Sequence, residues 1–489
     1  MHTVTQWQHS PTTPRFTEAP TRMGPAVGRT RHQICLGDNI KYVRVQWVDF
    51  SNTLRFHVIP APEFSRLCKD ARPSMRVTAR TLGLVNLRFA KGFDDTAERL
   101  YVFDLDSFRV CAYAPGHASV MGWFQRKTPS PEGDLVQDTC PRTLLQRVVR
   151  DAKTKAGFTF LCGFESEFIL LSTTSSEPIP IVEEGWCSSA KLRTGSVHSV
   201  VLEEIADSLQ TAGIEVLTYH AEGAAGQFEV VTGPLPPLEA VDTLVHTRET
   251  IYNVASKHGL RATFAPRVSM KGVGSGQHVH ISLKSSRAFP DPDTSAEIVK
   301  APTLTFTVRS FLQGLVEHLP ALCALMLPTP QSYWRVRDGI SSGGTYACWG
   351  AENKEVPLRL CGDKGSHRVE VKTPDGTSNP YLVVASLLAA GVHGVLTGEK
   401  LKVGNCVKPV ACMNNEEKKK AGIDDASKLP RSIQEARKLF EEDDVLREVL
   451  RDDCVDKYIS VNECCTQLLG EFMAKPLEEE SVNHLLKYY

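Results

Sequence analysis

Two glutamates, Glu165 and Glu167, interrupt the apolar run FTFLCGFESEFILL, whose remaining residues are typical of a buried strand. Side chains alternate between the two faces of a strand, so these two carboxylates point the same way. A buried carboxylate without a partner is costly, or its pKa rises until it is neutral. The pair therefore predicts a positive partner that the strand itself does not supply.

Three further segments, HAEGAAGQFEVV, GSGQHVHISL and HRVEVK, also combine an apolar face with a polar face. Their polar positions are, in chain order, Glu222, Glu229, His278, His280, Ser282, Arg368, Glu370 and Lys372. A single strand of this kind is commonly an edge strand with one solvated face. Several in one chain, with the glutamates backed by large apolar residues, favour a curved sheet that lines a polar cavity.

Five glutamates in one cavity would repel one another unless cations lay among them. Mg²⁺ and Mn²⁺ accept carboxylate oxygens and Mn²⁺ also accepts imidazole, whereas zinc would require more His or Cys. We therefore predict two or more Mg²⁺ or Mn²⁺ ions, a site suited to phosphate chemistry. No GxxxxGK[ST] loop is present, and the GVGSG stretch at residues 272–276 precedes a strand, which excludes a P-loop and a Rossmann fingerprint.

Cations follow further along the chain, where Arg335, Lys354 and Arg359 lie near aromatic residues in QSYWRVRDG and CWGAENKEVPLRL. Each alone is more commonly a surface cation. As a group beside a carboxylate–metal site, they predict clamps for phosphates and for a carboxylate substrate. His220, two residues before Glu222, either faces the substrate or packs as a structural histidine, and the sequence leaves both open.

The elements that position these residues mix strands and helices without strict alternation, which predicts an α+β fold. Residues 40–60 alternate as two strands joined at Ser51 and Asn52. Helices are expected over residues 140–157 and 236–259, a strand over 260–268, and amphipathic helices from residue 432 onward. The apolar run 381–396 is too short, and too interrupted by Gly and His, to span a bilayer, so it predicts a buried helix.

Length and composition narrow the class of protein. A chain of 489 residues suggests about two domains, and a net charge of -1 with pI near 6.9 argues against nucleic acid or an anionic membrane as partner. Fourteen cysteines without a CxxC pair indicate a reducing compartment, so we expect a cytoplasmic protein. Residues 1–32 are rich in Pro and Thr and predict a disordered tail; a transit peptide stays open, although prolines interrupt every candidate helix.

The order of these motifs resembles the glutamine synthetase family. ExE is followed by E-x6-E with GQ between, GSGxHxH, SY-x-R and finally HRVEVKTPDGTSNPYL, and the resemblance covers nearly everything from about residue 35 onward. It implies a small β-grasp domain at residues 33–120, where QWVDF is similar to the family, and a catalytic domain at 121–489. In that domain a curved antiparallel sheet lines the site and helices lie outside. CWGAENKEVPLR is similar to the bacterial-type subgroup of fungi, which includes γ-glutamyl-amine ligases.

The resemblance also implies roles for single residues. The ligands of one metal match Glu167, Glu222 and Glu229, and those of the other match Glu165, His278 and Glu370. The nucleotide contacts match His280, Ser282, Lys354 and Arg359. The substrate contacts match Gly274, Arg335 and Lys372. The catalytic residues match Arg335, Arg359 and Asp49, the last lent by a neighbouring subunit.

The reaction implied by the resemblance is a two-step ligation. ATP phosphorylates the side-chain carboxylate of glutamate or a similar acid, and ammonia or a primary amine then displaces phosphate. The family also implies a large ring-shaped homo-oligomer, with active sites between subunits.

The chain departs from the family on the substrate side. Val273 replaces an asparagine, lysines at 354 and 372 replace arginines, and residues 341–344 (SSGG) lack the glutamate that deprotonates ammonium. All six metal positions are kept, so we predict a working ligase whose nucleophile is a primary amine. Two alternatives stay open: a non-catalytic regulatory or structural protein on the same fold, and a metal-dependent hydrolase or kinase.

Overall fold

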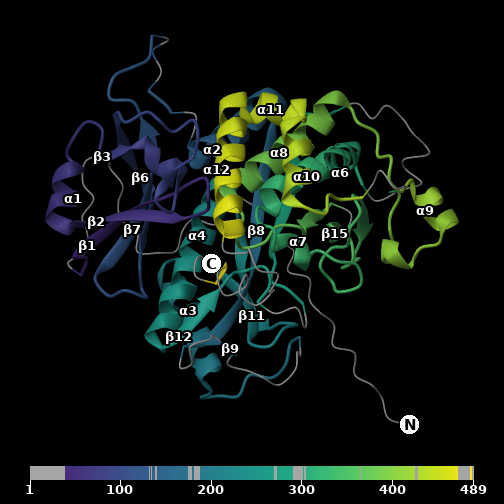
Figure 1. The fold of residues 1–489 in the computed structure, drawn as a ribbon, viewed down its shortest axis with the longest axis horizontal. Coiled ribbons are helices and arrows are strands. Elements are labelled where there is room, and N and C mark those ends of the chain that lie inside the picture. The colour runs from purple at the N-terminus through teal and green to yellow at the C-terminus, as the bar shows by residue number, and fades with distance from the viewer. Residues whose placement is uncertain are drawn as a thin grey trace.

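The structure is a computed structural model. It describes residues 39–131, 133, 135–137, 140–173, 179–180, 188–268, 273–289, 301, 304–363, 365–423, 428–471, 485–486 and 489. The tail predicted at residues 1–32 lies outside these. A lobe of N-terminal strands lies at one side of the molecule, and a larger lobe of strands and helices forms the rest (Figure 1). Both kinds of element are present in each lobe, which confirms the α+β class.

The first lobe is a five-stranded sheet of order β2-β1-β7-β6-β3. Its strands are β1 (Tyr42–Val48), β2 (Leu54–Pro60), β3 (Ser74–Thr78), β6 (Glu98–Val110) and β7 (His117–Gln125), with helix α1 (Ala61–Leu67) after β2. β1 and β2 pair antiparallel around a turn in which Asn52 has φ 64°, which confirms the predicted hairpin. β7 continues to Gln125, so the boundary predicted at residue 120 lies inside a strand of this sheet.

The second lobe contains a nine-stranded sheet, of which seven strands follow the order β10-β11-β8-β13-β16-β15-β14. Its strands are β8 (Phe158–Ser172), β9 (Ile179–Pro180), β10 (Val216–Ala221), β11 (Gln227–Leu235), β12 (Leu260–Thr263), β13 (Gln277–Ser285), β14 (Trp349–Ala351), β15 (Leu358–Cys361) and β16 (Arg368–Val371). β8 lies at the centre and pairs antiparallel with β11 and β13. The sheet is not wholly antiparallel as expected, because β14 and β15 pair in parallel.

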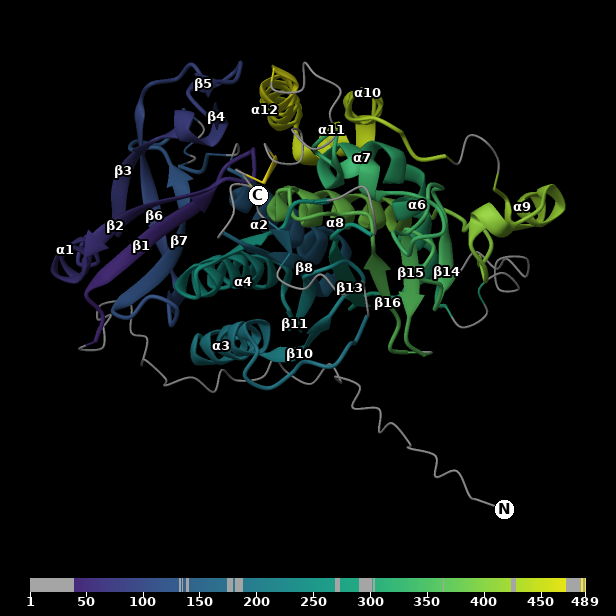
Figure 2. The same ribbon diagram turned by 60° about the horizontal axis from the view of Figure 1, so that its bottom comes forward.

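Helices lie beside this sheet and extend beyond it (Figure 2). They are α2 (Pro141–Asp151), α3 (Val197–Thr211), α4 (Pro237–Lys257), α6 (Phe306–Met326), α7 (Ser332–Arg335), α8 (Pro380–Thr397), α9 (Asn415–Ala421), α10 (Ile433–Glu441), α11 (Asp444–Leu450) and α12 (Asp452–Glu471). The helices expected at 140–157 and 236–259 are confirmed; the first becomes a π-helical turn after Asp151 and ends at Gly157, whose φ is 73°.

Helix α8 is the buried helix predicted from the apolar run. Among the described residues it is the one helix long and apolar enough to cross a membrane, and 83% of its apolar window is buried inside the protein. It packs against α6 and α2. A Cβ on Gly314 of α6 would lie 2.3 Å from the carbonyl oxygen of Ala390, and one on Gly394 would lie 2.3 Å from that of Ser310, so this close helix crossing requires both glycines.

A buried ionic network joins the two lobes. Arg142 of α2 bonds both carboxylate oxygens of Asp242 in α4, at 3.0 and 2.7 Å, and reaches Asp104 of β6 at 2.5 Å. Tyr381 of α8 donates its hydroxyl to Asp242 at 2.6 Å. The guanidinium also stacks on Trp123 of β7, 3.9 Å from the ring centroid. One arginine thus ties the N-terminal sheet to the helices that cover the second sheet.

Candidate active site

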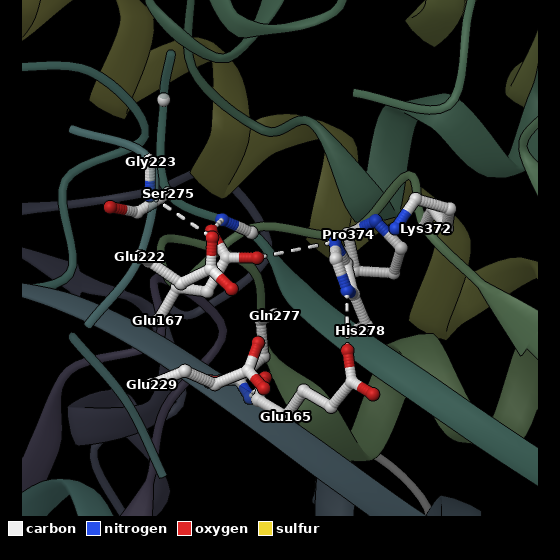
Figure 3. Close-up of polar contacts among 12 residues, drawn as sticks. Glu165, Glu167, Glu222, Gly223, Glu229, Ser275, Gln277, His278, Lys372 and Pro374 are labelled. Carbon is white, nitrogen blue, oxygen red and sulfur yellow. Dashed lines mark hydrogen bonds and ion pairs between the residues drawn. The ribbon is translucent and has the colours of Figure 1, made fainter. Parts of the chain in front are cut away.

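The strand register of the second sheet brings the predicted residues into rows. Glu229 of β11 lies opposite Glu167 of β8, and Glu165 lies opposite His278 of β13. On the next pair, His280 lies opposite Glu370 of β16. Figure 3 shows the carboxylates of Glu165, Glu167 and Glu229 and the His278 ring directed toward a common space. The period-two alternation of four separate strands therefore produces one cluster.

Glu165 lies between two imidazoles. Its Oε2 is 2.8 Å from His278 Nδ1, and its Oε1 is 2.9 Å from His280 Nε2. His278 Nδ1 is also 3.4 Å from Glu370 Oε1, and His278 Nε2 is 3.5 Å from Glu167 Oε1. Three carboxylates from two strands thus surround the two histidines of β13.

Besides His278, neutral groups hold Glu167 in place. Gln227, at the start of β11, donates its side-chain amide to Glu167 Oε2 at 3.0 Å, to the carbonyl oxygen of Gly274 at 3.2 Å and toward Ser275 Oγ at 3.1 Å. The backbone N–H of Gly276 donates to the same carboxylate oxygen at 2.8 Å. Gln227 is 2% exposed, so it fixes both the carboxylate and the glycine loop from inside the protein.

His220 of β10 lies beside the remaining two glutamates. Its Nε2 is 3.3 Å from Glu229 Oε1, and its Nδ1 is 3.6 Å from Glu222 Oε1. Glu222 follows β10, and Glu229 lies opposite His220 in the pairing of β10 with β11. Of the two readings left open by the sequence, the structure therefore supports a histidine in the polar cluster.

Three sets of donor atoms lie close enough together to hold metal ions. Within each set the atoms are no more than 4.8 Å apart, and the sets are Glu165–His280–Glu370, Glu165–Glu229–His278 and His220–Glu222–Glu229. Five of the six residues implied as ligands fall in these sets; the sixth, Glu167, falls in none of them, although its carboxylate lies 3.5 Å from His278 Nε2. The grouping differs from the implied one, because His280, expected at the nucleotide, shares a set with Glu370, and His220 joins Glu222 and Glu229.

Burial and mutual repulsion set the charges of this cluster. The pKa of Glu222 is raised, first by burial and then by Glu167 and Glu229. Burial also raises the pKa of Glu229. Although burial opposes ionisation of Glu165, hydrogen bonds from His278 and His280 hold its pKa below the usual range. The hydrogen bond to Glu229 raises the pKa of His220 to about 9. The histidines here serve as counter-charges for carboxylates, a role that divalent cations would take over.

Two predicted cations flank Glu370. Arg359 Nη1 lies 2.9 Å from Glu370 Oε2, and Lys372 Nζ lies 3.1 Å from Glu370 Oε1. Burial opposes its ionisation, but Lys372 and His278 lower the pKa of Glu370 to about 2. Arg359 also bridges to Glu352, at 3.0 Å, so it links the cluster to the surface. Lys354 is exposed, in the loop after β14.

Gly274 and Arg335, two implied substrate residues, are in direct contact. A Cβ on Gly274 would lie 2.6 Å from Cγ of Arg335 and 2.2 Å from the carbonyl oxygen of Pro266. Arg335 is 2% exposed; its Nη2 donates to the carbonyl oxygens of Thr373 and, at 3.2 Å, Pro374, while its Nε has no partner among the described residues. Burial lowers the pKa of this guanidinium.

Asp49 and Ser282 lie away from these contacts. Asp49 follows β1 and is 0% exposed; its Oδ1 accepts the backbone N–H groups of Ser51 and Thr53, each at 2.9 Å, and its Oδ2 lies 2.6 Å from Arg55. Its carboxylate therefore organises its own hairpin, and its loan to a neighbouring subunit stays a prediction. Ser282 follows His280 on the same face of β13 and is partly buried.

Two of the departures on the substrate side are Val273 and the SSGG loop, and the structure shows what each of them contacts. Val273 packs over the loop after Glu222, since a Cβ on Gly223 would lie 2.8 Å from Val273 Cγ2. In the SSGG loop, a Cβ on Gly343 would lie 3.2 Å from Cβ of Lys372. A carboxylate does contact this loop: Glu355 accepts the backbone N–H of Ser341 at 2.5 Å and that of Gly339 at 3.1 Å. It comes from the next segment of the chain, so inspection of residues 341–344 could not find it.

Sequence reasoning also missed two groups beside Glu370. The thiol of Cys361 lies 3.7 Å from Glu370 Oε2, and Glu352 holds the far side of Arg359. Cys361 is two residues beyond Arg359 on β15, so strand alternation would have placed both on one face. Glu352 follows β14 with φ 54°, a backbone conformation that the sequence pattern does not reveal.

Comparisons of the sequence and of the fold with known proteins agree with one another. Residues 138–480 match the family described as "Glutamine synthetase, catalytic domain". Gamma-glutamylpolyamine synthetase GlnA3 of Streptomyces coelicolor is 34% identical over 381 residues, which cover 76% of this chain and 77% of that protein. Protein fluG of Emericella nidulans is 32% identical over 430 residues, 86% of this chain but 46% of that protein, so the chain spans about half the length of that relative. Among solved structures, a GmaS/ADP complex superimposes with a TM-score of 0.71 at 22% identity, covering 90% of this chain and 96% of that one, which shows a shared fold.

Proposed function

This chain belongs to the glutamine synthetase family, and from that membership we propose that it is an ATP-dependent ligase that joins a primary amine to the side-chain carboxylate of glutamate or a similar acid. The observation that carries the proposal is the cluster of four strands, in which Glu165, Glu167, Glu229, His278 and Glu370 meet beside cations. A protein of this fold that no longer bound metal ions would gain nothing from keeping so many mutually repelling carboxylates together.

The donor set fits Mg²⁺ or Mn²⁺. Carboxylate oxygens dominate each of the three sets, with one imidazole in each, as expected for hard divalent cations and as Mn²⁺ tolerates. We propose that Glu165, Glu167, Glu222, Glu229, His278 and Glu370 hold two or more such ions. When bound, these ions would neutralise charge on ATP phosphates and on the phosphoryl group in transfer.

Other residues of the chain would bind the nucleotide and the acid substrate. Arg359, released from Glu370 and Glu352, would donate its planar fork to phosphate oxygens, with His280, Ser282 and Lys354 at the nucleotide. Among the described residues, the buried Nε of Arg335 beside Gly274 has no hydrogen-bond partner, which suits this side chain to the carboxylate of the acid substrate.

The proposed chemistry has two balanced steps. An oxygen of the substrate carboxylate attacks the γ-phosphorus of ATP, ADP leaves, and an acyl phosphate forms. The amine nitrogen then attacks the acyl carbon, inorganic phosphate leaves and the nitrogen loses a proton. The acyl phosphate must be shielded from water, which buried positions such as Arg335 and Glu167 favour.

A primary amine is favoured over ammonia by the substrate side of the site. Val273 and the glycines of the SSGG loop place apolar or small residues where the family has an asparagine and a glutamate, and a carboxylate that does contact this loop, that of Glu355, accepts backbone N–H groups of Gly339 and Ser341. A relative with 34% identity carries the name γ-glutamylpolyamine synthetase, and a GmaS structure shares the fold, which supports an amine as nucleophile. A larger amine would make more contact with these residues than ammonium does.

We extend the proposal to the organisation of the chain. The five-stranded sheet would form the β-grasp domain, with its end moved to Gln125, and residues beyond it the catalytic domain. The protein would assemble as a ring-shaped homo-oligomer, as the family implies. Sedimentation velocity of the purified chain tests this, since a monomer at micromolar concentration would contradict it.

The activity is tested with pure protein, ATP, Mn²⁺, glutamate and a panel of ammonia, monoamines and polyamines. We expect ADP release that requires both glutamate and an amine, and a γ-glutamyl amide with the mass of the added amine. Clear preference for ammonia would reject the amine assignment. ATP hydrolysis without an acceptor would favour a hydrolase, and the absence of turnover with every acceptor would favour a non-catalytic protein. The Glu167→Gln variant serves as the inactive control.

A further inference from the structure

Asp375 is a buried aspartate outside the carboxylate cluster, in the segment that follows Glu370 and Lys372 along the chain. Its side chain is 0% exposed. Its Oδ1 accepts the backbone N–H of Thr377 at 2.9 Å and also the Thr377 hydroxyl, whereas its Oδ2 has no hydrogen-bond partner among the described residues. Because a buried carboxylate without full compensation is costly, we looked for a positive charge that stabilises this one.

Arg335 supplies such a charge. Its Nη2 donates to the carbonyl oxygens of Thr373 and Pro374, the two residues directly before Asp375, and lies 3.4 Å from that of Lys372. The guanidinium therefore rests on the backbone that leads into Asp375. Burial lowers the pKa of Arg335, and Asp375 opposes this effect. Burial also raises the pKa of Asp375, and Arg335 in turn opposes that rise.

Helix α7 places the two charged side chains on one side. Ser332 and Arg335 are three residues apart in α7, so their side chains share a face of the helix. Ser332 Oγ lies 2.8 Å from Thr329 Oγ1 and 3.5 Å from Thr377 Oγ1, the hydroxyl that Asp375 accepts. The fold thus seats Asp375 against the face of α7 that carries Arg335.

The other side of the Arg335 guanidinium faces the candidate active site. A Cβ on Gly276 would lie 3.3 Å from Arg335 Nη1, and one on Gly274 would lie 2.6 Å from its Cγ. Arg335 Nε has no hydrogen-bond partner among the described residues, so no hydrogen bond joins it to Asp375 Oδ2. The carboxylate therefore compensates the guanidinium through space and leaves N–H groups of Arg335 for a ligand.

We propose that Asp375 is a positioning residue for the acid substrate, whose carboxylate it places by serving as the fixed, buried counter-charge of Arg335. Before the substrate binds, Asp375 compensates a guanidinium that would otherwise be a buried charge without a counter-charge. When the substrate binds, its carboxylate meets an arginine that is already held in place. The inference rests on the proposed function only for the identity of the acid that Arg335 receives.

A purely structural role of Asp375 would depend on Oδ1 alone. This oxygen closes a local turn with the backbone N–H of Thr377, and the oxygen of an asparagine side chain would accept the same hydrogen bonds. Asp375→Asn therefore keeps the turn and removes the charge. Thr377→Val is the matched opposite, because it removes a hydrogen bond of the turn and keeps the charge of Asp375.

Isothermal titration calorimetry of the full-length protein with L-glutamate, in the presence of Mn²⁺ and a non-hydrolysable ATP analogue, tests the proposal. Asp375→Asn should weaken glutamate binding about 10- to 100-fold, as loss of an orienting partner does at other sites, and leave the affinity for the ATP analogue unchanged. Thr377→Val should bind glutamate as the wild type does. Unchanged glutamate affinity in folded Asp375→Asn would overturn the proposal, and so would an equal loss of affinity for glutamate and for the analogue.

A double-mutant cycle measured by urea denaturation does not depend on the proposed ligase activity. If Asp375 and Arg335 compensate each other, the double variant Asp375→Asn/Arg335→Gln should lose less stability than the two single variants lose together. Asp207→Asn, at an exposed aspartate of α3, is the control and should be additive with Arg335→Gln. Additive losses for Asp375 and Arg335 would refute their pairing. Absence of glutamate binding in the wild type would count against the proposed function, and this cycle would then decide the pairing alone. If Asp375→Asn does not fold, Asp375→Ser, which also lacks the charge and can close the turn, takes its place in both measurements.

Discussion

Replacement of Gln227 by methionine removes the amide that holds Glu167. In the wild-type protein this carboxylate oxygen accepts two hydrogen bonds, from Gln227 at 3.0 Å and from the backbone of Gly276 at 2.8 Å. The same amide also contacts Gly274 and Ser275, so its loss loosens the glycine loop as well. Methionine keeps the volume and length of the side chain, which limits the change to hydrogen bonding.

The expected cost follows from these contacts. A hydrogen bond to a charged group contributes about 1.5–3 kcal/mol, and about 1.4 kcal/mol corresponds to a tenfold change in an equilibrium constant. Loss of one bond to Glu167 therefore predicts a Mn²⁺ affinity about 10- to 100-fold lower, the range seen when groups that orient metal ligands are removed. The other two contacts of the amide contribute less, because their acceptors are neutral.

The assay is a Mn²⁺ titration followed by electron paramagnetic resonance, which counts unbound Mn²⁺. Gln46→Met is the matched control, since Gln46 is also buried, at 3% exposed, but its amide nitrogen has no hydrogen-bond partner among the described residues. The control should bind Mn²⁺ as the wild type does. If Gln227→Met also binds Mn²⁺ with wild-type affinity while remaining folded, the assignment of Glu167 as an oriented metal ligand is refuted.

Three further substitutions test other parts of the structure. Arg142→Met leaves the buried Asp242 and the half-buried Asp104 without their cation and should lower the free energy of unfolding by about 3–5 kcal/mol, measured by urea denaturation. Burial lowers the pKa of His246 to about 3, so between about pH 3 and 6.5 the unfolded chain binds one proton more than the folded chain. Because of this group, the free energy of unfolding falls on acidification by about 1.4 kcal/mol per pH unit. The His246→Phe variant should lack this slope, and an unchanged slope would contradict the prediction. Gly276→Ala places a Cβ 2.6 Å from His278 Nε2 and should abolish Mn²⁺-dependent turnover, whereas Gly470→Ala, whose new Cβ meets no atom of the described residues within 4 Å, should leave turnover unchanged.

Strand alternation predicted which residues share a face, because the side-chain period of a strand is a local property. The glutamates of β8 and the histidines of β13 were therefore recognisable from the sequence. Their pairing was not, since the register of β13 against β8 and of β11 against β8 is set by packing between distant segments. For that reason the sequence could list the cluster but could not predict that His280 lies beside Glu370 and His220 beside Glu229.

Contacts between neighbouring segments of the chain also escaped prediction, because they depend on how the loops fold back. Glu355 supplies a carboxylate to the SSGG loop from a neighbouring segment, although residues 341–344 contain no acid. The role of Asp49 beside a neighbouring subunit stays a prediction, because the contacts of its carboxylate among the described residues lie within its own hairpin and with Arg55. The parallel pair β14–β15 was missed because both strands are only three or four residues long, too short for a periodic signal.

The proposal that divalent cations bind within the carboxylate cluster is tested best by diffraction from crystals soaked in manganese, recorded at the manganese absorption edge. We expect at least two anomalous peaks within the carboxylates of Glu165, Glu167, Glu222, Glu229 and Glu370, each beside the imidazoles that now compensate them. Crystals of folded protein with these five carboxylates in place and no anomalous peak among them would show that the cluster does not bind divalent cations, and the proposed ligase chemistry would fall with it.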